Sequence, residues 1–133
     1  TWGRPKVPAL VAFDYAIVRL VPRVEREEFI NVGVIVHAPT RGFLGCALRL
    51  DRGRLGAFAP GLDLDALARH LEAFRAVCAG EADAGPIAGL ALSERFHWLV
   101  APRSAVLQTS PVHGGMCEDP AAALRELLAR RVA

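Results

Sequence analysis

Residues that could bind an anion are concentrated between positions 15 and 33. The candidate site residues of this stretch are Tyr15, Arg19, Arg26, Glu28, Asn31 and Gly33. A guanidinium beside a side-chain amide can hold a carboxylate or another anion through hydrogen bonds. A glycine nearby would let a ligand or another main chain come close. We therefore expect Arg19, Asn31 and Gly33 to form the centre of a binding surface.

A second polar stretch lies between positions 102 and 120. Its candidate residues are Arg103, Ser104, Gln108 and His113. With the flexible Gly114–Gly115 pair, these side chains could bind phosphate or activate a water molecule. A phosphate or nucleotide site would then use Arg19 and Arg103 as clamps and His113 as acid or base.

A nucleophilic triad can also be drawn from this second stretch. Its members would be Ser104 or Ser110, His113 and Asp119. However, neither serine lies in the pattern of a nucleophile elbow, and the glycine pair lacks the longer spacing of a phosphate-binding loop. Serine, glutamine and histidine side chains in loops also commonly bond the main chain. We therefore expect binding rather than catalysis.

Arg19 has a structural explanation as well as a functional one. It could form an ion pair with Glu28 or Asp119, because ion pairs are commoner than binding sites. Asp119 itself is suited to cap a helix, since Pro120 follows it and proline favours the first helical position. The choice between the two explanations depends on whether the fold gives Arg19 an acidic neighbour.

The composition is that of one compact domain. The chain has 133 residues, of which 53% are hydrophobic and 23% are charged, and this length can bury a core of its own. We assign residues 1–12 to an N-terminal arm and residues 13–133 to a single domain. The formal net charge of +2 is too small to predict nucleic-acid binding unless the arginines gather on one face.

The sequence predicts neither a metal site nor a membrane span. The three cysteines have none of the close spacings of zinc or dithiol sites, and the four histidines are scattered. The apolar run from residue 9 to residue 18 is too short to cross a bilayer and contains Asp14. We expect no cofactor, reduced thiols and a cytoplasmic location.

Residue patterns predict four strands and two main helices. Runs of β-branched and aromatic residues indicate strands at positions 13–21, 29–37, 43–50 and 105–110. Helical periodicity indicates a helix between Asp63 as N-cap and Gly80 as stop. A second helix should begin at Asp119 and end near residue 130. The expected fold is α+β: an antiparallel sheet of about four strands with two main helices packed on one face.

The first two strands should form a hairpin with a charged connection. If this hairpin is symmetric about Glu25, Arg19 pairs with Asn31 and Tyr15 pairs with Ile35. The odd-numbered residues then share one face, on which Tyr15, Arg19, Asn31 and His37 surround Gly33. The even-numbered, apolar residues would face the core.

The two polar stretches together resemble a bacterial family, the domain of unknown function 3037. Its pattern is Tyr-x3-Arg-x2-Pro, then Arg-x-Glu-Phe-x-Asn-x-Gly-Val, and later Pro-Arg-Ser, a Gln, Ser-Pro, His-x-Gly and Asp-Pro. The matching positions are Tyr15, Arg19, Pro22, Arg26, Glu28, Phe29, Asn31, Gly33 and Val34, then Pro102, Arg103, Ser104, Gln108, Ser110, Pro111, His113, Gly115, Asp119 and Pro120. Similar proteins more often carry a hydroxyl residue at the position of Cys117, which argues against a catalytic thiol there.

The resemblance implies a protein partner and no established catalytic residue, because family members are often encoded beside a kinase of the toxin-like serine/threonine type. We therefore expect a small cytosolic binding or regulatory module that is the partner of a kinase-like protein. Its surface would include Arg19, Asn31 and Arg103. The alternative is a phosphate- or nucleotide-binding domain, with hydrolysis as its further activity. The oligomeric state is left open.

Overall fold

The computed structural model describes residues 9–102 and 105–132, and within these ranges it forms an antiparallel sheet with helices. The strands are β1 (Val11–Leu20), β2 (Ile30–Ala38), β3 (Phe43–Leu48), β4 (Leu107–Thr109) and β5 (His113–Cys117). The α-helices are α1 (Arg52–Phe58), α2 (Leu64–Ala79), α3 (Leu92–Leu99) and α4 (Pro120–Arg131). Short 3-10 turns are η1 (Val24–Arg26), η2 (Pro39–Arg41) and η3 (Pro86–Gly89). The predicted α+β class is confirmed.

The sheet has the order β3-β2-β1-β4, and β5 pairs with the first half of β1. All pairs are antiparallel, so β4 and β5 lie one after the other along the same edge of β1. Ser110 joins them: its main-chain N–H donates to Ile17 O at 2.8 Å, and its hydroxyl oxygen accepts from Ile17 N at 2.8 Å. The predicted strand at 105–110 is therefore short, and β5 was not predicted. The described part of the chain has five strands rather than about four.

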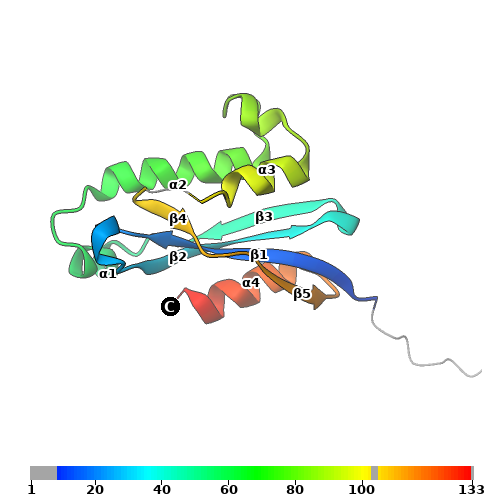
Figure 1. The fold of residues 1–133 in the computed structure, drawn as a ribbon, viewed down its shortest axis with the longest axis horizontal. Helices are drawn as coiled ribbons and strands as arrows, with labels where there is room; N and C mark the ends of the chain where they lie inside the picture. The colour runs from blue at the N-terminus through cyan, green and yellow to red at the C-terminus, as the bar shows by residue number, and fades with distance from the viewer. Residues whose placement is uncertain (1–8, 103–104, 133) are drawn as a thin grey trace, which may run out of the picture.

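Helices cover both faces of the sheet, which corrects the expected arrangement on one face. Figure 1 shows α2 and α3 on one side of the strands and α4 on the other. The reason lies in β2, where every residue except Asn31 is buried. A strand that is apolar on both faces needs a covering layer on each side. The sheet therefore separates two apolar clusters.

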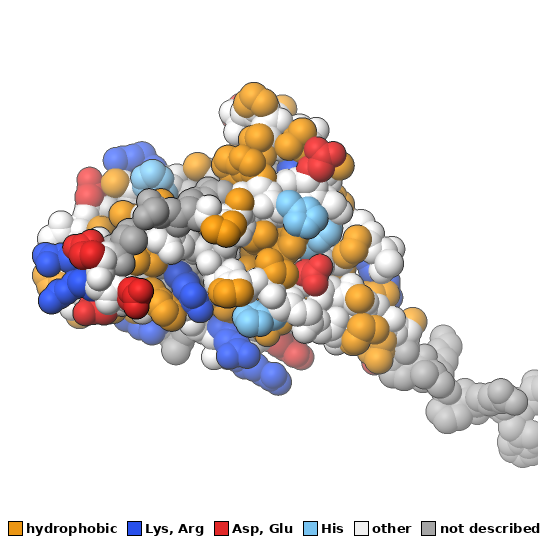
Figure 2. All heavy atoms as spheres, in the orientation of Figure 1, with side chains coloured by type: hydrophobic (Ala, Val, Ile, Leu, Met, Phe, Trp, Pro, Cys, Tyr) orange, Lys and Arg blue, Asp and Glu red, His pale blue; other side chains and the backbone are white. Residues whose placement is uncertain are grey.

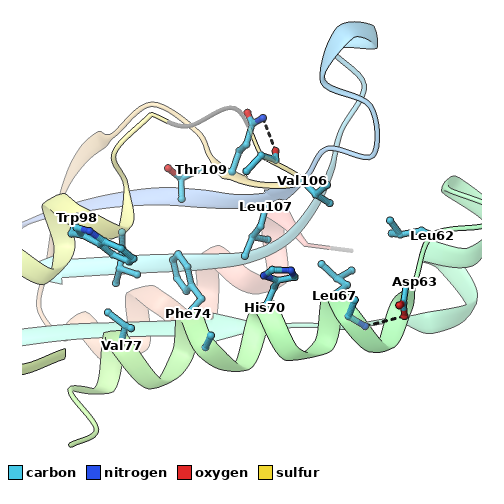
Figure 3. Close-up of a pocket in the computed structure, with 15 residues that line it drawn as sticks. Leu62, Asp63, Leu67, His70, Phe74, Val77, Trp98, Val106, Leu107 and Thr109 are labelled. Atoms are coloured by element: carbon cyan, nitrogen blue, oxygen red, sulfur yellow. Dashed lines mark hydrogen bonds between the residues drawn. The ribbon is translucent and has the colours of Figure 1, made fainter. Parts of the chain in front are cut away.

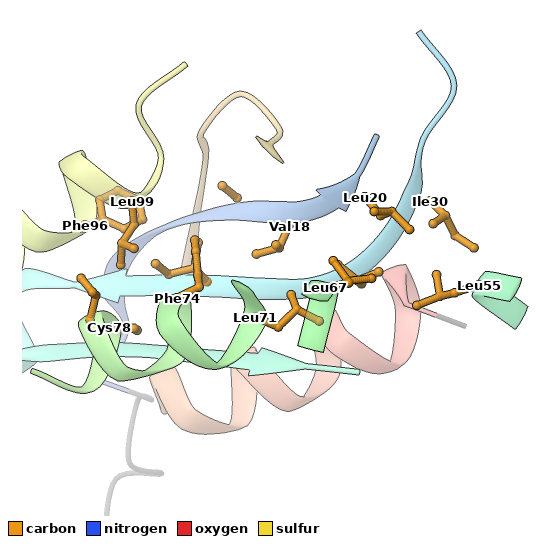
Figure 4. Packing of buried hydrophobic residues seen from close by; sticks show 14 residues of the cluster. Val18, Leu20, Ile30, Leu55, Leu67, Leu71, Phe74, Cys78, Phe96 and Leu99 are labelled. Atoms are coloured by element: carbon orange, nitrogen blue, oxygen red, sulfur yellow. The ribbon is translucent and has the colours of Figure 1, made fainter. Parts of the chain in front are cut away.

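The larger cluster lies between the sheet and α2 and α3 (Figure 4). Helix α2 begins where Asp63 Oδ1 accepts from Ala66 N at 3.0 Å and ends at Gly80 in the left-handed conformation, as predicted. Its inward side chains are Leu67, Leu71, Phe74, Val77 and Cys78. On the other face, α4 begins at Pro120 after its cap Asp119, also as predicted.

A bulge in the β1–β2 hairpin changes the predicted register. Arg19 pairs with Asn31 as expected, but Val18 pairs with Gly33, so Val32 is an extra residue in β2. Beyond the bulge each β2 residue is displaced by one position, and its side chain changes face. The predicted pairing of Tyr15 with Ile35 is wrong, because Tyr15 pairs with Val36.

The described part of the predicted N-terminal arm differs slightly from expectation. Strand β1 begins at Val11, two residues before the predicted strand. Residues 1–8 of the arm lie outside the described residues. No described helix is both long and apolar enough to cross a lipid bilayer.

Candidate functional site

Arg19, Asn31 and Gln108 lie side by side on three neighbouring strands, and we call them the Arg19 row. Arg19 pairs with Asn31 of β2 on one side and with Gln108 of β4 on the other, and cross-strand partners share a face. That face is the one covered by α4, because Asn31 Nδ2 donates to Arg131 O at 2.9 Å. The sequence therefore predicted the pairing of Arg19 with Asn31 correctly, whereas the position of Gln108 beside Arg19 was not predicted.

Arg19 has no acidic partner among the described residues. Glu28 lies 4.0 Å from Arg26, and the Asp119 carboxylate accepts from Ala121 N as the cap of α4. The Arg19 guanidinium instead lies 4.1 Å above the centre of the Phe29 ring, a favourable cation–π geometry. The ion-pair explanation of Arg19 is thus not what the structure shows.

Two buried polar atoms of the row have no hydrogen-bond partner among the described residues: Arg19 Nε and Asn31 Oδ1. The first is a donor and the second an acceptor. Buried polar groups are almost always paired, so each unpaired one needs an explanation. Phe29, which is 46% exposed, lies beside them at the surface. Because both atoms are buried, a ligand at the surface does not contact them directly.

The remaining predicted residues lie elsewhere. The Tyr15 and His113 rings contact each other, with centroids 5.4 Å apart, on paired residues of β1 and β5. Tyr15 precedes Arg19 by four residues, roughly 13 Å along a strand, so His113 is not beside Arg19. Arg26 and Glu28 form an exposed pair near the η1 turn. Arg103 and Ser104 lie outside the described residues.

Gly33 does not face the Arg19 row. A Cβ atom at this position would lie 2.5 Å from Leu48 Cδ2 and 2.7 Å from Ala47 O. The close approach that a glycine permits here is therefore that of strand β3, which already fills the space. The expectation that Gly33 admits a ligand beside Arg19 does not fit this geometry.

His37, expected on the face of Arg19, lies instead under α3 because of the bulge. It is 3% exposed, its ring stacks on Phe96 with centroids 4.8 Å apart, and its Nε2 lies 3.1 Å from Ser93 Oγ. Burial lowers the pKa of His37 below 6.5, while the nearby Asp14 acts in the opposite direction. This contact resembles a nucleophile–base pair in distance only, because a base this deeply buried cannot reach a substrate.

The other members of the conceivable triad also have structural contacts. The Ser110 hydroxyl bonds the main chain of Ile17 and Pro111, and Asp119 caps α4. The described ranges contain no group of three or more side chains that could hold a metal ion.

One cavity was not predicted from the sequence. It is a groove of about 510 Å³ between α2, the end of α3 and β4 (Figure 3). The groove is lined by Leu62, Asp63, Ala66, Leu67, His70, Ala73, Phe74, Val77, Trp98, Leu99, Ala105, Val106, Leu107, Gln108 and Thr109. Most of these side chains are apolar, and Trp98 and Val106 are each 42% exposed. The sequence of α2 does contain a pattern that indicates this groove. Beside the residues that face the core, a second row at helical spacing is formed by Ala66, His70, Ala73 and Val77.

Few polar groups face this groove. Asp63 is occupied as the cap of α2, and the Thr109 hydroxyl donates to Val100 O at 3.3 Å. His70 extends from α2 towards Leu107 (Figure 3). The groove therefore combines an apolar wall with one exposed imidazole, which suits a ligand that is mainly apolar.

Two thiols meet on the opposite side of α2. Cys46 of β3 and Cys78 of α2 are in hydrogen-bonding contact, which lowers the pKa of Cys46 and raises that of Cys78. Burial raises the pKa of Cys78 further and that of Cys117 as well. Cys46 and Cys117 are both partly buried, but only Cys46 of the three thiols has a lowered pKa, so it is the thiol best placed to react.

Comparison with known proteins agrees with the resemblance seen in the sequence. No curated protein and no solved structure matches the chain. Residues 15–132, nearly the whole chain, match the family described as protein of unknown function (DUF3037). The match includes the Arg19 row and the groove. The chain therefore belongs to the DUF3037 family.

Proposed function

We propose that this protein is a binding module and that the groove between α2 and β4 holds a small, mainly apolar ligand. The observation that carries the proposal is the cavity itself. Its volume of about 510 Å³ falls within the roughly 300 to 1,000 Å³ of small-molecule sites, which are also mostly apolar with a few polar groups. Exposed apolar surface of this kind on a small protein commonly marks a binding site.

Catalysis has less support from the geometry. The Ser110 hydroxyl bonds the main chain, the His113 ring contacts the Tyr15 ring, and the His37 ring contacts the Ser93 hydroxyl. The phosphate- or nucleotide-binding alternative retains Arg19 as an anion clamp. Its hydrolytic step would need His113 beside Arg19, and the two are separated by roughly 13 Å along the sheet edge.

A kinase-like partner remains a proposal that rests on the family resemblance. A ligand-binding module and a protein partner are compatible, because Arg19 and Asn31 lie on the face covered by α4, whereas the groove lies beside α2 on the other face and shares only Gln108 with the row. A small molecule in the groove could therefore act on a complex formed through the other face.

The groove can be tested with tryptophan fluorescence. The chain has two tryptophans, so Trp2→Phe leaves Trp98 at the groove as the only one. Straight-chain and aromatic carboxylic acids of increasing length would be titrated into this variant. We expect a saturable change in Trp98 emission for at least one series, with affinity increasing with apolar length by roughly 0.8 kcal/mol per buried methylene.

A matched pair of substitutions distinguishes the groove from the rest of the surface. Ala73→Phe places a ring in the groove from an exposed position of α2, whereas Ala129→Phe places the same ring on an exposed position of α4. Ala73→Phe should abolish the fluorescence titration and Ala129→Phe should leave it unchanged. Equal titrations in both variants, or none with any acid in the parent, would refute the proposal.

A further inference from the structure

The Arg19 row carries a second inference, independent of the groove. We infer that the row docks an acidic segment of a partner protein. A carboxylate of that segment binds the Arg19 guanidinium. An apolar side chain of the segment packs against the exposed ring of Phe29.

Charge is the first argument for an acidic segment. No described carboxylate pairs with Arg19. Two more arginines flank the row through the end of α4: Asn31 bonds the main chain of Arg131, and the Arg49 guanidinium donates to Val132 O at 2.8 Å. Figure 2 shows basic side chains gathered near the C-terminal end of α4, in the lower half of the view. This surface therefore complements a negatively charged partner.

The geometry of the guanidinium is the second argument. Its position 4.1 Å above the centre of the Phe29 ring restricts the motion of the guanidinium, a group that can bind a planar carboxylate through two N–H groups. Ordering an arginine side chain before binding reduces the entropy that binding must overcome. A guanidinium held this way is better suited to a specific carboxylate than a freely moving surface arginine.

The exposed ring of Phe29 favours a peptide over a simple anion. Phe29 is 46% exposed and lies against the Arg19 guanidinium. Phosphate or acetate can pair with the guanidinium but leaves most of this ring uncovered, whereas a peptide segment can carry a carboxylate and an apolar side chain close together. The row is therefore matched to an acidic peptide segment that also carries an apolar residue.

The test is binding of labelled peptides to the full chain. Fluorescein-labelled 12-residue peptides of equal length would be compared by anisotropy: Asp- and Glu-rich sequences with interspersed leucine, the same sequences with Asn and Gln, and a basic set. We expect saturable binding of acidic peptides only. Tighter binding of inorganic phosphate or of a single-stranded oligonucleotide than of every acidic peptide would overturn the inference.

Substitutions then separate specific docking from general charge attraction. Arg19→Lys keeps the charge but removes Nε and the fork, and we expect it to weaken binding about tenfold, or about 1.4 kcal/mol. Arg130→Gln removes a charge from the exposed last turn of α4 and should change the affinity less than twofold. Phe29→Ala, at an exposed position that leaves the core intact, should weaken binding severalfold.

The relative affinities of these variants for acidic peptides show whether binding depends on Arg19 specifically or on positive charge in general. If Arg19→Lys binds as tightly as the parent, or if Arg130→Gln weakens binding equally, attraction is general and the inference is wrong. Ala73→Phe should leave peptide binding unchanged, so failure of the groove proposal and failure of this one are distinguishable. The thermal unfolding of each variant shows that a lost affinity is not a lost fold.

Discussion

Gly33→Ala tests the packing of the bulged hairpin against β3. Gly33 does not adopt a positive φ, unlike Gly42 or Gly80, so its substitution costs no backbone strain and any effect is steric. The new methyl would lie 2.5 Å from Leu48 Cδ2 and 2.7 Å from Ala47 O. The Leu48 side chain can rotate away, but the Ala47 carbonyl belongs to the main chain of β3 and cannot.

The expected cost is therefore at the upper end for an overpacked core, about 3 kcal/mol of unfolding free energy. Urea denaturation monitored by circular dichroism measures it, with an unchanged m-value showing that the native and denatured states are otherwise comparable. Gly56→Ala is the matched control: nothing lies within 4 Å of its Cβ, and alanine in a helix should stabilise by roughly 0.5 to 1 kcal/mol. A Gly33→Ala variant within 0.5 kcal/mol of the parent would refute the β2–β3 packing described above.

Three further predictions follow from buried or paired groups. His37 is protonated below about pH 6.5 in the unfolded chain, but the fold holds its pKa lower, so the free energy of unfolding should decrease as the pH drops below that value. Urea denaturation across this pH range should show a smaller decrease for His37→Gln than for the parent. Ser110→Ala should cost about 2 kcal/mol, because the buried N–H of Ile17 loses its acceptor; unchanged urea denaturation would contradict this bond. Iodoacetamide at pH 7.5 should modify Cys46 first and Cys78 last, as peptide mass spectrometry would show; equal rates would contradict their opposite pKa shifts.

Local signals in the sequence predicted most of the individual elements. The caps Asp63 and Asp119 mark the starts of α2 and α4 because each carboxylate accepts from a free N–H of the first turn. Strand β5 gave no such signal, since His-Gly-Gly-Met-Cys has little strand propensity. It is a strand because the first half of β1 presents main-chain groups that β5 can pair.

The layer arrangement required information that alternation alone does not contain. The residues from Val32 to Val36 form a nearly unbroken apolar run, and such a run is typical of a strand buried on both faces. The prediction that β2 has one polar face was wrong, because it assumed a symmetric hairpin without a bulge. The groove was not predicted for a related reason. A single row of apolar residues facing the sheet was expected on α2, but the apolar surface of this helix extends beyond its contact with the sheet and also lines the groove.

The bulge explains why one part of the predicted site was right and another was wrong. Arg19 and Asn31 lie between the bulge and the hairpin connection, where the symmetric register holds. Gly33 and His37 lie beyond it, where one extra residue moves each β2 side chain to the opposite face. His37 consequently lies in the core under α3, while Arg19 remains beside Asn31 at the end of α4. A bulge thus separates a buried structural histidine from an arginine that pairs with no carboxylate in the described part of the chain, and of the two only the arginine lies beside the exposed ring of Phe29.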